Sequence, residues 1–146
     1  MGMESKVVLL IEDNADDERL TLRALRRNNI MNEVVVAVDG ETALKHLHGD
    51  EGATERPALI LLDLRLPGLS GFDVLQKIRE HPKTRLIPIV VLTANRDPDA
   101  VVKAYEAGAN SYLVKPTDPV EYSEVVLQIG MYWLLLNEVA GQKTRA

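Results

Sequence analysis

The sequence predicts an α/β protein with a doubly wound, five-stranded parallel sheet that carries helices on both faces. Short, continuous runs of aliphatic residues alternate with longer amphipathic segments, five times along the 146-residue chain. Continuously apolar runs are typical of parallel strands that are buried on both faces. A helix after each strand supplies the crossover that a parallel sheet needs, so the alternation indicates this layered architecture.

The composition is that of one ordinary globular domain. Hydrophobic residues make up 46% of the chain and charged residues 27%, which is enough for a proper core. The formal net charge of -5 disfavours nucleic-acid binding, and the absence of cysteine excludes disulfides and Cys-ligated metals. No apolar run reaches the roughly 18 residues of a membrane span, and no signal-peptide pattern opens the chain, so we expect a cytoplasmic protein without a membrane segment.

The first two strand–helix units cover the N-terminal third. The first strand is expected at Lys6–Ile11, and Asn14 is a plausible cap for the helix Ala15–Arg27. Three acids at the start of this helix suit the positive end of its dipole: Asp16, Asp17 and Glu18. The second strand is expected at Glu33–Val38, and Asp39 should cap the helix after it.

The middle of the chain contains a polar loop and two further strands. The loop His48–Arg56 precedes the third strand, which is expected at Ala58–Leu62. Ser70 and Asp73 form a capping-box-like start for the next helix. The fourth strand is expected at Pro88–Leu92.

The last third contains two helices with the same kind of start. Asp97-Pro98 and Asp118-Pro119 each place a capping residue before a proline at the first helical position. The first of these helices is expected to end at Gly108, and the fifth strand to follow at Ser111–Val114. The final helix is expected to run to about Asn137.

Polar side chains close four of the five predicted strands. The carboxyl ends of the strands in an open parallel sheet line the crevice where ligands bind. We therefore expect the residues at these strand ends to converge on one edge: Glu12, Asp13, Asp63, Thr93 and Lys115.

The chemistry of this group predicts a cation. Three carboxylates in one pocket repel one another, so their pKa values rise unless positive charge lies among them, and one lysine is insufficient. Mg²⁺ suits the site because it uses one or two carboxylates, keeps several waters and binds phosphate oxygens. A carboxylate beside Mg²⁺ and a lysine can attack a phosphorus atom. Each residue alone could be a helix cap or an ordinary strand end, so the hypothesis depends on their joint placement.

Four motifs together resemble the receiver domain of two-component response regulators. They are IEDN (Ile11–Asn14), LLDLRLPGLSG (Leu61–Gly71), VVLTA (Val90–Ala94) and YLVKP (Tyr112–Pro116). The resemblance extends over residues 6–137 and implies a flavodoxin-like strand order of 2-1-3-4-5. It would leave residues 138–146 as a C-terminal tail with no output domain. A signal would then pass through contacts with another protein, or the domain would be a phosphate carrier or sink.

The resemblance also implies how a phosphoryl group would be accepted. Asp63 would be the phosphoacceptor for a sensor histidine kinase, and the domain would catalyse its own phosphorylation and a slow dephosphorylation. Mg²⁺ would be held by Asp13 and Asp63 directly and by Glu12 largely through water. The backbone carbonyl of Arg65 would complete the metal's coordination.

Further residues would respond to the phosphoryl group, by the same resemblance. Thr93 would move to donate a hydrogen bond to it, and Ala94 would leave room for it. Lys115 would pair with a phosphoryl oxygen, and the Lys115–Pro116 peptide bond would be cis. Tyr112 would be an aromatic switch; the alternative is an amphipathic strand residue with its hydroxyl in water.

Two regions resemble the small regulators that accompany bacterial and cyanobacterial phytochrome kinases. One is the long loop HGDEGATERP before the third strand, and the other is the apolar C-terminal stretch GMYWLLLNEV. This resemblance implies a phytochrome as the partner kinase.

Two other functions compete with a phosphorylation switch. An aspartyl phosphatase would need a second Asp two residues after the nucleophile, where this chain has Arg65. The segment GLSG does not complete a hydrolase elbow either, because Phe72 stands where that motif needs glycine. A degenerate receiver would lack a site residue, and none is missing.

The histidines have no partner at ligand spacing and are expected in solvent: His46, His48 and His81.

The final helix has two apolar stripes at about 3.6 residues per turn. One stripe would cover the sheet: Tyr122, Val125, Val126, Ile129, Trp133 and Leu136. The second lies opposite and predicts the interface of a homodimer: Leu127, Met131, Leu134 and Leu135. The alternatives are that the helix end folds under a loop or that these are scattered exposed residues.

Overall fold

The computed structural model describes residues 6–27, 33–49, 56–138 and 140. They form one five-stranded parallel sheet in the order β2-β1-β3-β4-β5, which confirms the predicted fold class and strand order. Most of the predicted polar loop (residues 50–55) and most of the predicted tail (139 and 141–146) lie outside the described residues. No helix within the described part of the chain is long and apolar enough to cross a membrane.

The strands fall close to their predicted positions. They are β1 (Val7–Ile11), β2 (Glu33–Ala37), β3 (Leu59–Leu62), β4 (Ile89–Thr93) and β5 (Ser111–Val114). The flanking residues that were also predicted as strand lie just outside: Lys6, Val38, Ala58 and Pro88. Thr93, predicted to follow the fourth strand, is its last residue. β1 lies between β2 and β3, with Leu9 opposite both Val35 and Ile60.

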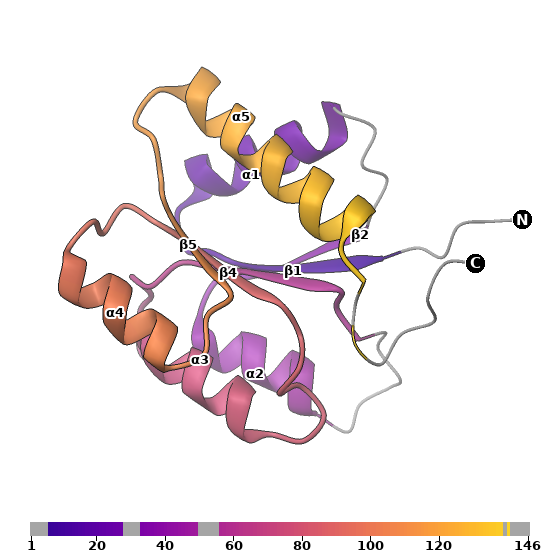
Figure 1. Cartoon of the computed structure of the whole chain (residues 1–146), viewed down its shortest axis with the longest axis vertical. Helices are drawn as coiled ribbons and strands as arrows, with labels where there is room; N and C mark the ends of the chain where they lie inside the picture. The colour runs from indigo at the N-terminus through magenta and orange to yellow at the C-terminus, as the bar shows by residue number, and fades with distance from the viewer. Residues whose placement is uncertain (1–5, 28–32, 50–55, 139, 141–146) are drawn as a thin grey trace, which may run out of the picture.

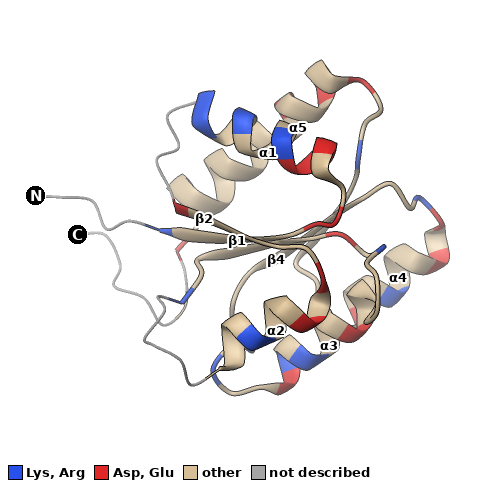
Figure 2. Cartoon of the chain, turned by 180° about the vertical axis from the view of Figure 1, so that it is seen from behind, with Lys and Arg blue, Asp and Glu red and all other residues tan. Residues whose placement is uncertain are grey.

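The helices cover the two faces of the sheet unequally. They are α1 (Ala15–Arg27), α2 (Gly40–His48), α3 (Gly71–Glu80), α4 (Pro98–Glu106), α5 (Pro119–Gly130) and the π-helix η1 (Met131–Leu136). Figure 1 shows α1 and α5 on one face and α2, α3 and α4 on the other. On α1, acidic residues stand in the first turn and basic residues in the last, as Figure 2 shows.

The predicted caps are confirmed by hydrogen bonds at the helix starts. The Asn14 side chain accepts the Asp17 N–H at 2.9 Å and starts α1. At the other helices a side-chain oxygen likewise accepts a first-turn N–H, from Asp39, Ser70, Asp97 and Asp118. The helix α4 ends as predicted before Gly108, whose φ of 111° is in the left-handed region that favours glycine. The caps therefore mark where these helices begin.

The sheet separates two hydrophobic layers. Along β1, Leu9 and Ile11 belong to the layer under α2 and α3, whereas Val8 and Leu10 belong to the layer under α1 and α5. Gly71 begins α3 at a point where a Cβ would lie 2.5 Å from the Leu64 Cα. Only glycine allows this approach, which holds the segment that follows β3 against the start of α3.

The end of the final helix differs from its prediction. The α-helix stops at Gly130 and continues as the π-helix Met131–Leu136, in which each turn contains more residues than in an α-helix. The side chains of this segment therefore point in other directions around the helix axis than α-helical periodicity predicts. Leu134, predicted on the exposed stripe, is only 1% exposed and packs in the core, whereas Leu136, predicted to cover the sheet, is 71% exposed. Both assignments were wrong because they assumed α-helical periodicity throughout.

Two histidines are also placed differently from their prediction. The rings of His48 and His81 stack with centroids 3.9 Å apart, and His48 Nε2 lies 2.9 Å from Thr84 Oγ1. Thr84 Oγ1 donates to the Ile78 carbonyl, so His48 Nε2 must be the donor in its own bond. Burial, together with the charges of His81 and Lys83, lowers the pKa of His48. The pair joins the end of α2 to the end of α3 and is not simply solvated.

Arg79 joins α3 to two loops on the same side of the sheet. Its Nε donates to the Gly108 carbonyl at 2.9 Å, and Nη1 donates to the carbonyls of Ile87 at 2.7 Å and Arg85 at 3.0 Å. Nη2 donates to Asn110 Oδ1 at 2.8 Å. The planar guanidinium therefore fixes the segments that lead into β4 and β5.

Replacing the Arg79 guanidinium is expected to destabilise the fold. Arg79→Lys keeps the charge but cannot reach all of these acceptors, so the free energy of unfolding should fall by about 2 kcal/mol in urea denaturation. Lys77→Ala, on an exposed position of the same helix, should change it by less than about 0.5 kcal/mol. An Arg79→Lys variant as stable as the wild type would contradict this role.

Candidate functional site

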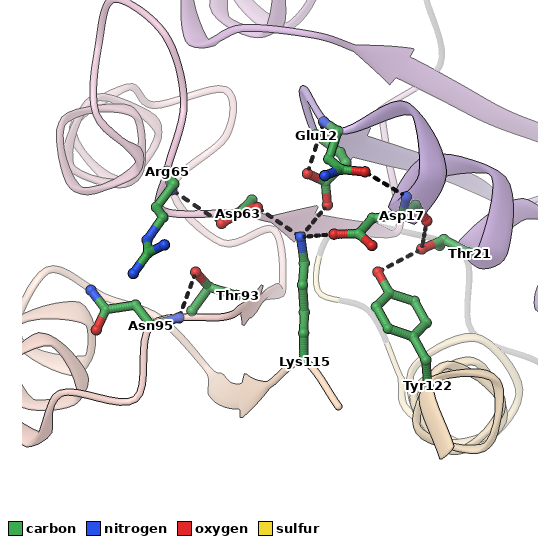
Figure 3. Close-up of polar contacts among 10 residues, drawn as sticks. Glu12, Asp17, Thr21, Asp63, Arg65, Thr93, Asn95, Lys115 and Tyr122 are labelled. Atoms are coloured by element: carbon green, nitrogen blue, oxygen red, sulfur yellow. Dashed lines mark hydrogen bonds and ion pairs between the residues drawn. The ribbon is translucent and has the colours of Figure 1, made fainter. Parts of the chain in front are cut away.

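The polar strand ends meet at one edge of the sheet, as predicted. Glu12 follows β1, Asp63 follows β3, Thr93 ends β4 and Lys115 follows β5, and all four residues are buried. Asp13 is next to them but exposed. Figure 3 shows the side chains of Glu12 and Asp63 directed at the Lys115 ammonium from different strand ends.

The Lys115 ammonium is shared by three carboxylates. Its Nζ lies 2.7 Å from Glu12 Oε1, 2.7 Å from Asp17 Oδ2 and 2.8 Å from Asp63 Oδ2. An ammonium has three N–H donors, so these contacts use all of them. Asp17 was predicted only to complement the dipole of α1, so sequence reasoning missed it as a site residue. The available signal was its place four residues after Asp13, in the first helical turn behind a strand end.

The two buried carboxylates differ in their proton affinity. Burial raises the pKa of Glu12 to about 7, although Lys115 acts in the opposite direction. Burial would also raise the pKa of Asp63, but hydrogen bonds from Lys115, the Arg65 N–H and Thr93 outweigh it and lower that pKa below its usual value. The same contacts outweigh the effect of burial on Lys115 and raise its pKa. Asp63 is therefore ionised and Lys115 is charged near neutral pH.

A second acidic arrangement overlaps with the first. Glu12, Asp13 and Asp63 each offer a carboxylate oxygen, and these atoms lie within 4.8 Å of one another. Such oxygen donors suit a hard divalent cation, so the residues present fit the predicted kind of metal. The Arg65 N–H donates to Asp63 Oδ1 at 3.1 Å, which places Arg65 beside this group. The use of the Arg65 carbonyl as a ligand stays a prediction.

The residues predicted to respond to a phosphoryl group lie around the loop after β4. Thr93 Oγ1 accepts the Asn95 N–H at 3.4 Å, and the small Ala94 between them is exposed. The Tyr112 hydroxyl donates to the Asn95 carbonyl at 2.5 Å, so it is not simply in water. Burial raises the pKa of Tyr112. The switching roles of Thr93, Ala94 and Tyr112 stay predictions.

The Lys115–Pro116 peptide bond is trans, like every other peptide bond among the described residues. The predicted cis isomer is therefore wrong for this structure. Trans is the lower-energy isomer before proline by about 0.5–1 kcal/mol. The trans backbone also satisfies the local contacts, since the Lys115 N–H donates to the Thr93 carbonyl at 2.7 Å while its ammonium reaches the carboxylates.

A buried hydroxyl pair supports the site from the side of α1 and α5. Thr21 Oγ1 donates to the Asp17 carbonyl at 2.8 Å and lies 3.1 Å from the Tyr122 hydroxyl. Because the Thr21 proton is already used, Tyr122 is the donor to Thr21. Burial raises the pKa of Tyr122 to about 12. Sequence reasoning assigned Tyr122 only to the core and did not single out Thr21.

The fold and the strand-end chemistry define a receiver. Residues 8–127 match the family model of the response regulator receiver domain, and the chain belongs to this family. It is 38% identical over 131 residues to the response regulator Rcp1 of Synechocystis sp., covering 88% of this chain and 89% of Rcp1. It is also 38% identical over 136 residues to the probable methanogenesis regulatory protein FilR2 of Methanothrix harundinacea, covering 92% of this chain and 88% of that protein.

Solved structures show the same relationship. The crystal structure of the phosphorylated cyanobacterial phytochrome response regulator RcpA matches with a TM-score of 0.90 at 34% identity, covering 94% of this chain and 100% of RcpA. The Mn²⁺-bound form of Rcp1 matches with a TM-score of 0.86 at 36% identity, covering 93% and 99%. The bacteriophytochrome response regulator AtBRR matches with a TM-score of 0.69 at 41% identity, covering 93% and 100%. The resemblance to phytochrome-associated regulators is thereby confirmed.

Removing one carboxylate is expected to weaken cation binding. In Asp13→Asn, the loss of an exposed anionic donor should lower the affinity for Mg²⁺ by about tenfold or more. The measurement is a Mg²⁺ titration followed by the increase in melting temperature, which reports binding to the folded state. Without metal, the variant should be at least as stable as the wild type, because repulsion among the carboxylates is reduced.

The matched control is Asp16→Asn, which removes the same charge from an exposed position outside the acidic group. Its Mg²⁺ affinity should stay within about twofold of the wild type, as expected for an exposed charge. Equal affinities for Asp13→Asn and the wild type would remove Asp13 from the metal-binding group.

Proposed function

We propose that the protein is a phosphorylation switch in which Asp63 accepts a phosphoryl group from a sensor histidine kinase. The observation that carries this proposal is the environment of Asp63. Its carboxylate is ionised, it touches a fully paired lysine, and it shares a group of oxygen donors that fits a divalent cation. Output passes through a change in the protein surface that another protein recognises.

The proposed transfer needs little from the protein beyond position and charge. An Asp63 oxygen attacks phosphorus and forms a P–O bond as the P–N bond to the donor histidine breaks. The electron pair stays on the imidazole nitrogen, which takes up a proton, and Asp63 becomes an acyl phosphate. The Lys115 ammonium offsets negative charge on the transferring oxygens. Attack by water on the same phosphorus later restores the carboxylate, so the domain acts once per phosphoryl group received.

The proposed metal is Mg²⁺, held by the carboxylates of Asp13 and Asp63, by Glu12 and by the Arg65 carbonyl. When bound, it supplies positive charge beside the phosphoryl oxygens. The oxygen-only donor set supports a hard cation, and the Mn²⁺ in the Rcp1 crystal structure shows that a relative holds a divalent one.

The proposed switch uses the loop after β4. A phosphoryl group adds negative charge and acceptors beside Thr93, so it favours the arrangement in which the Thr93 hydroxyl reaches it. Ala94 leaves space for that movement. Thr93 and Tyr112 both bond to Asn95, so a shift of this loop changes the setting of both side chains together.

A phytochrome is the proposed source of the phosphoryl group. RcpA and AtBRR are named as phytochrome and bacteriophytochrome response regulators, and both match this chain over more than nine tenths of its length. Their similarity supports a phytochrome histidine kinase as the partner.

Asp63→Asn is expected to abolish phosphorylation. The amide is nearly isosteric with the carboxylate but is not a nucleophile, so incorporation from acetyl phosphate should fall on the order of a thousandfold or more. Incorporation is measured as acid-labile, base-labile phosphate per chain, and circular dichroism checks that the fold is retained. The control Asp99→Asn changes an exposed acid in the first turn of α4 and should label like the wild type.

The same assay separates the switch from the alternative of a phosphatase. The wild type should hold at most one phosphate per chain. Acid-labile phosphate on Asp63→Asn would remove Asp63 as the acceptor, and rapid, repeated release of phosphate from the wild type would favour an enzyme.

We also propose that the protein forms a homodimer through the end of its last helix. The structure changes which residues can take part: Leu134 is buried and withdrawn from the interface, and Leu127 is half-buried. Met131 and Leu135 are 48% and 40% exposed, and they belong to a six-residue segment without a charged side chain. A second copy presents the same uncharged surface, which suits the two-fold symmetry of most soluble oligomers.

The double variant Met131→Glu, Leu135→Glu is expected to be monomeric. Light scattering at roughly tens of micromolar protein should give the dimer mass for the wild type and half of it for the variant. The control Leu86→Glu, Val102→Glu introduces the same charges at two other exposed apolar positions and should stay dimeric. A monomeric wild type, phosphorylated or not, would contradict the dimer, and a dimeric Met131→Glu, Leu135→Glu variant would contradict this interface.

A further inference from the structure

Asp17 is a carboxylate in the site that the proposed phosphoryl chemistry leaves without a role. It accepts a hydrogen bond from Lys115 Nζ at 2.7 Å, as short as the bond to Glu12. However, it is not part of the group formed by Glu12, Asp13 and Asp63 that fits a cation. Its interaction at the site is therefore with Lys115.

The backbone around Asp17 is held in place from α5. Thr21 and Tyr122 are both buried, and their hydroxyls connect the Asp17 carbonyl to α5. Figure 3 shows this chain of contacts beside the Lys115 ammonium. The preceding residue, Asp16, has the same charge, but its side chain is 83% exposed and pairs with the exposed Arg19. The fixed first turn of α1 therefore directs Asp17, unlike Asp16, into the site.

Asp17 is also the partner that Lys115 can release most easily. Its side chain is 24% exposed, compared with 3% for Glu12 and 7% for Asp63. A carboxylate that loses an ammonium needs another partner, and water can replace the ammonium most readily at the most exposed of the three.

We propose that Asp17 is a positioning residue that holds Lys115 before phosphorylation and competes with the phosphoryl group for its ammonium. All three N–H donors of Lys115 are engaged, so a phosphoryl oxygen on Asp63 can gain one only if a present acceptor yields it. Asp17 is the acceptor that yields. The Asp17 carboxylate thus lowers the affinity of the site for a phosphoryl group. This inference rests on the proposed function.

The first test measures the affinity of the whole chain for beryllofluoride, an anionic mimic of a phosphoryl group on a carboxylate, at saturating Mg²⁺. Asp17→Asn removes the competing charge with almost no change in shape. We expect it to bind beryllofluoride about three- to fivefold more tightly than the wild type in calorimetric titration, which is the size of a partly exposed ion pair. Asp16→Asn, with the same loss of charge one residue earlier, should bind like the wild type.

The second test uses neither metal nor phosphoryl mimic. In ¹⁵N-edited NMR, the three bonds of the Lys115 ammonium should slow the exchange of its protons with water. Asp17→Asn should speed this exchange severalfold, because one proton loses its ionic partner, and Asp16→Asn should leave it unchanged. A residue that served only the stability of α1 would not change this signal while the fold is intact.

The outcomes separate the two proposals. If the wild type did not bind beryllofluoride, the proposed function would be overturned. Binding that is equal or weaker in Asp17→Asn would overturn the competition alone. Equal tightening in Asp16→Asn and Asp17→Asn would also overturn it, because net charge would then explain the effect. Unchanged proton exchange in Asp17→Asn would overturn the positioning of Lys115 by Asp17.

Discussion

The pairing of one buried ammonium with carboxylates from separate segments is the interaction on which the site depends. Lys115 comes from the end of β5, and its partners come from the ends of β1 and β3 and from α1. Neither sign of charge could be buried there alone, because an unpaired charge is strongly disfavoured in a protein interior. The sheet order makes the pairing possible by placing β1 beside β3 and ending the parallel strands at one edge.

The sequence was sufficient for the parts of the fold that follow from local rules. Aliphatic runs located all five strands to within a residue or so, and capping residues such as Asp97 and Asp118 located the helix starts. The convergence of Glu12, Asp63 and Lys115 followed from a general property of parallel sheets, in which the carboxyl ends of the strands line one crevice. The family resemblance added the strand order and the possible roles of these residues.

The sequence was insufficient where side chains from distant segments decide the outcome. Asp17 looked like any acid at a helix start, but it contacts the Lys115 ammonium and lies beside the contact between Thr21 and Tyr122. The stack of His48 on His81 depends on how the ends of α2 and α3 meet, which no spacing in the chain encodes. The Lys115–Pro116 peptide bond, which the family resemblance implied to be cis, is trans.

Because Met131–Leu136 forms a π-helix, the number of residues in this segment, as well as their type, decides which side chains face outward at the C-terminal surface. Each wide turn accommodates an extra residue, so a relative with one residue fewer could keep an α-helix and bury a different leucine. Two chains with similar residue types in this segment but different lengths could then present different surfaces. Alignments that match residue types here without allowing for a one-residue gap would pair an outward side chain with an inward one.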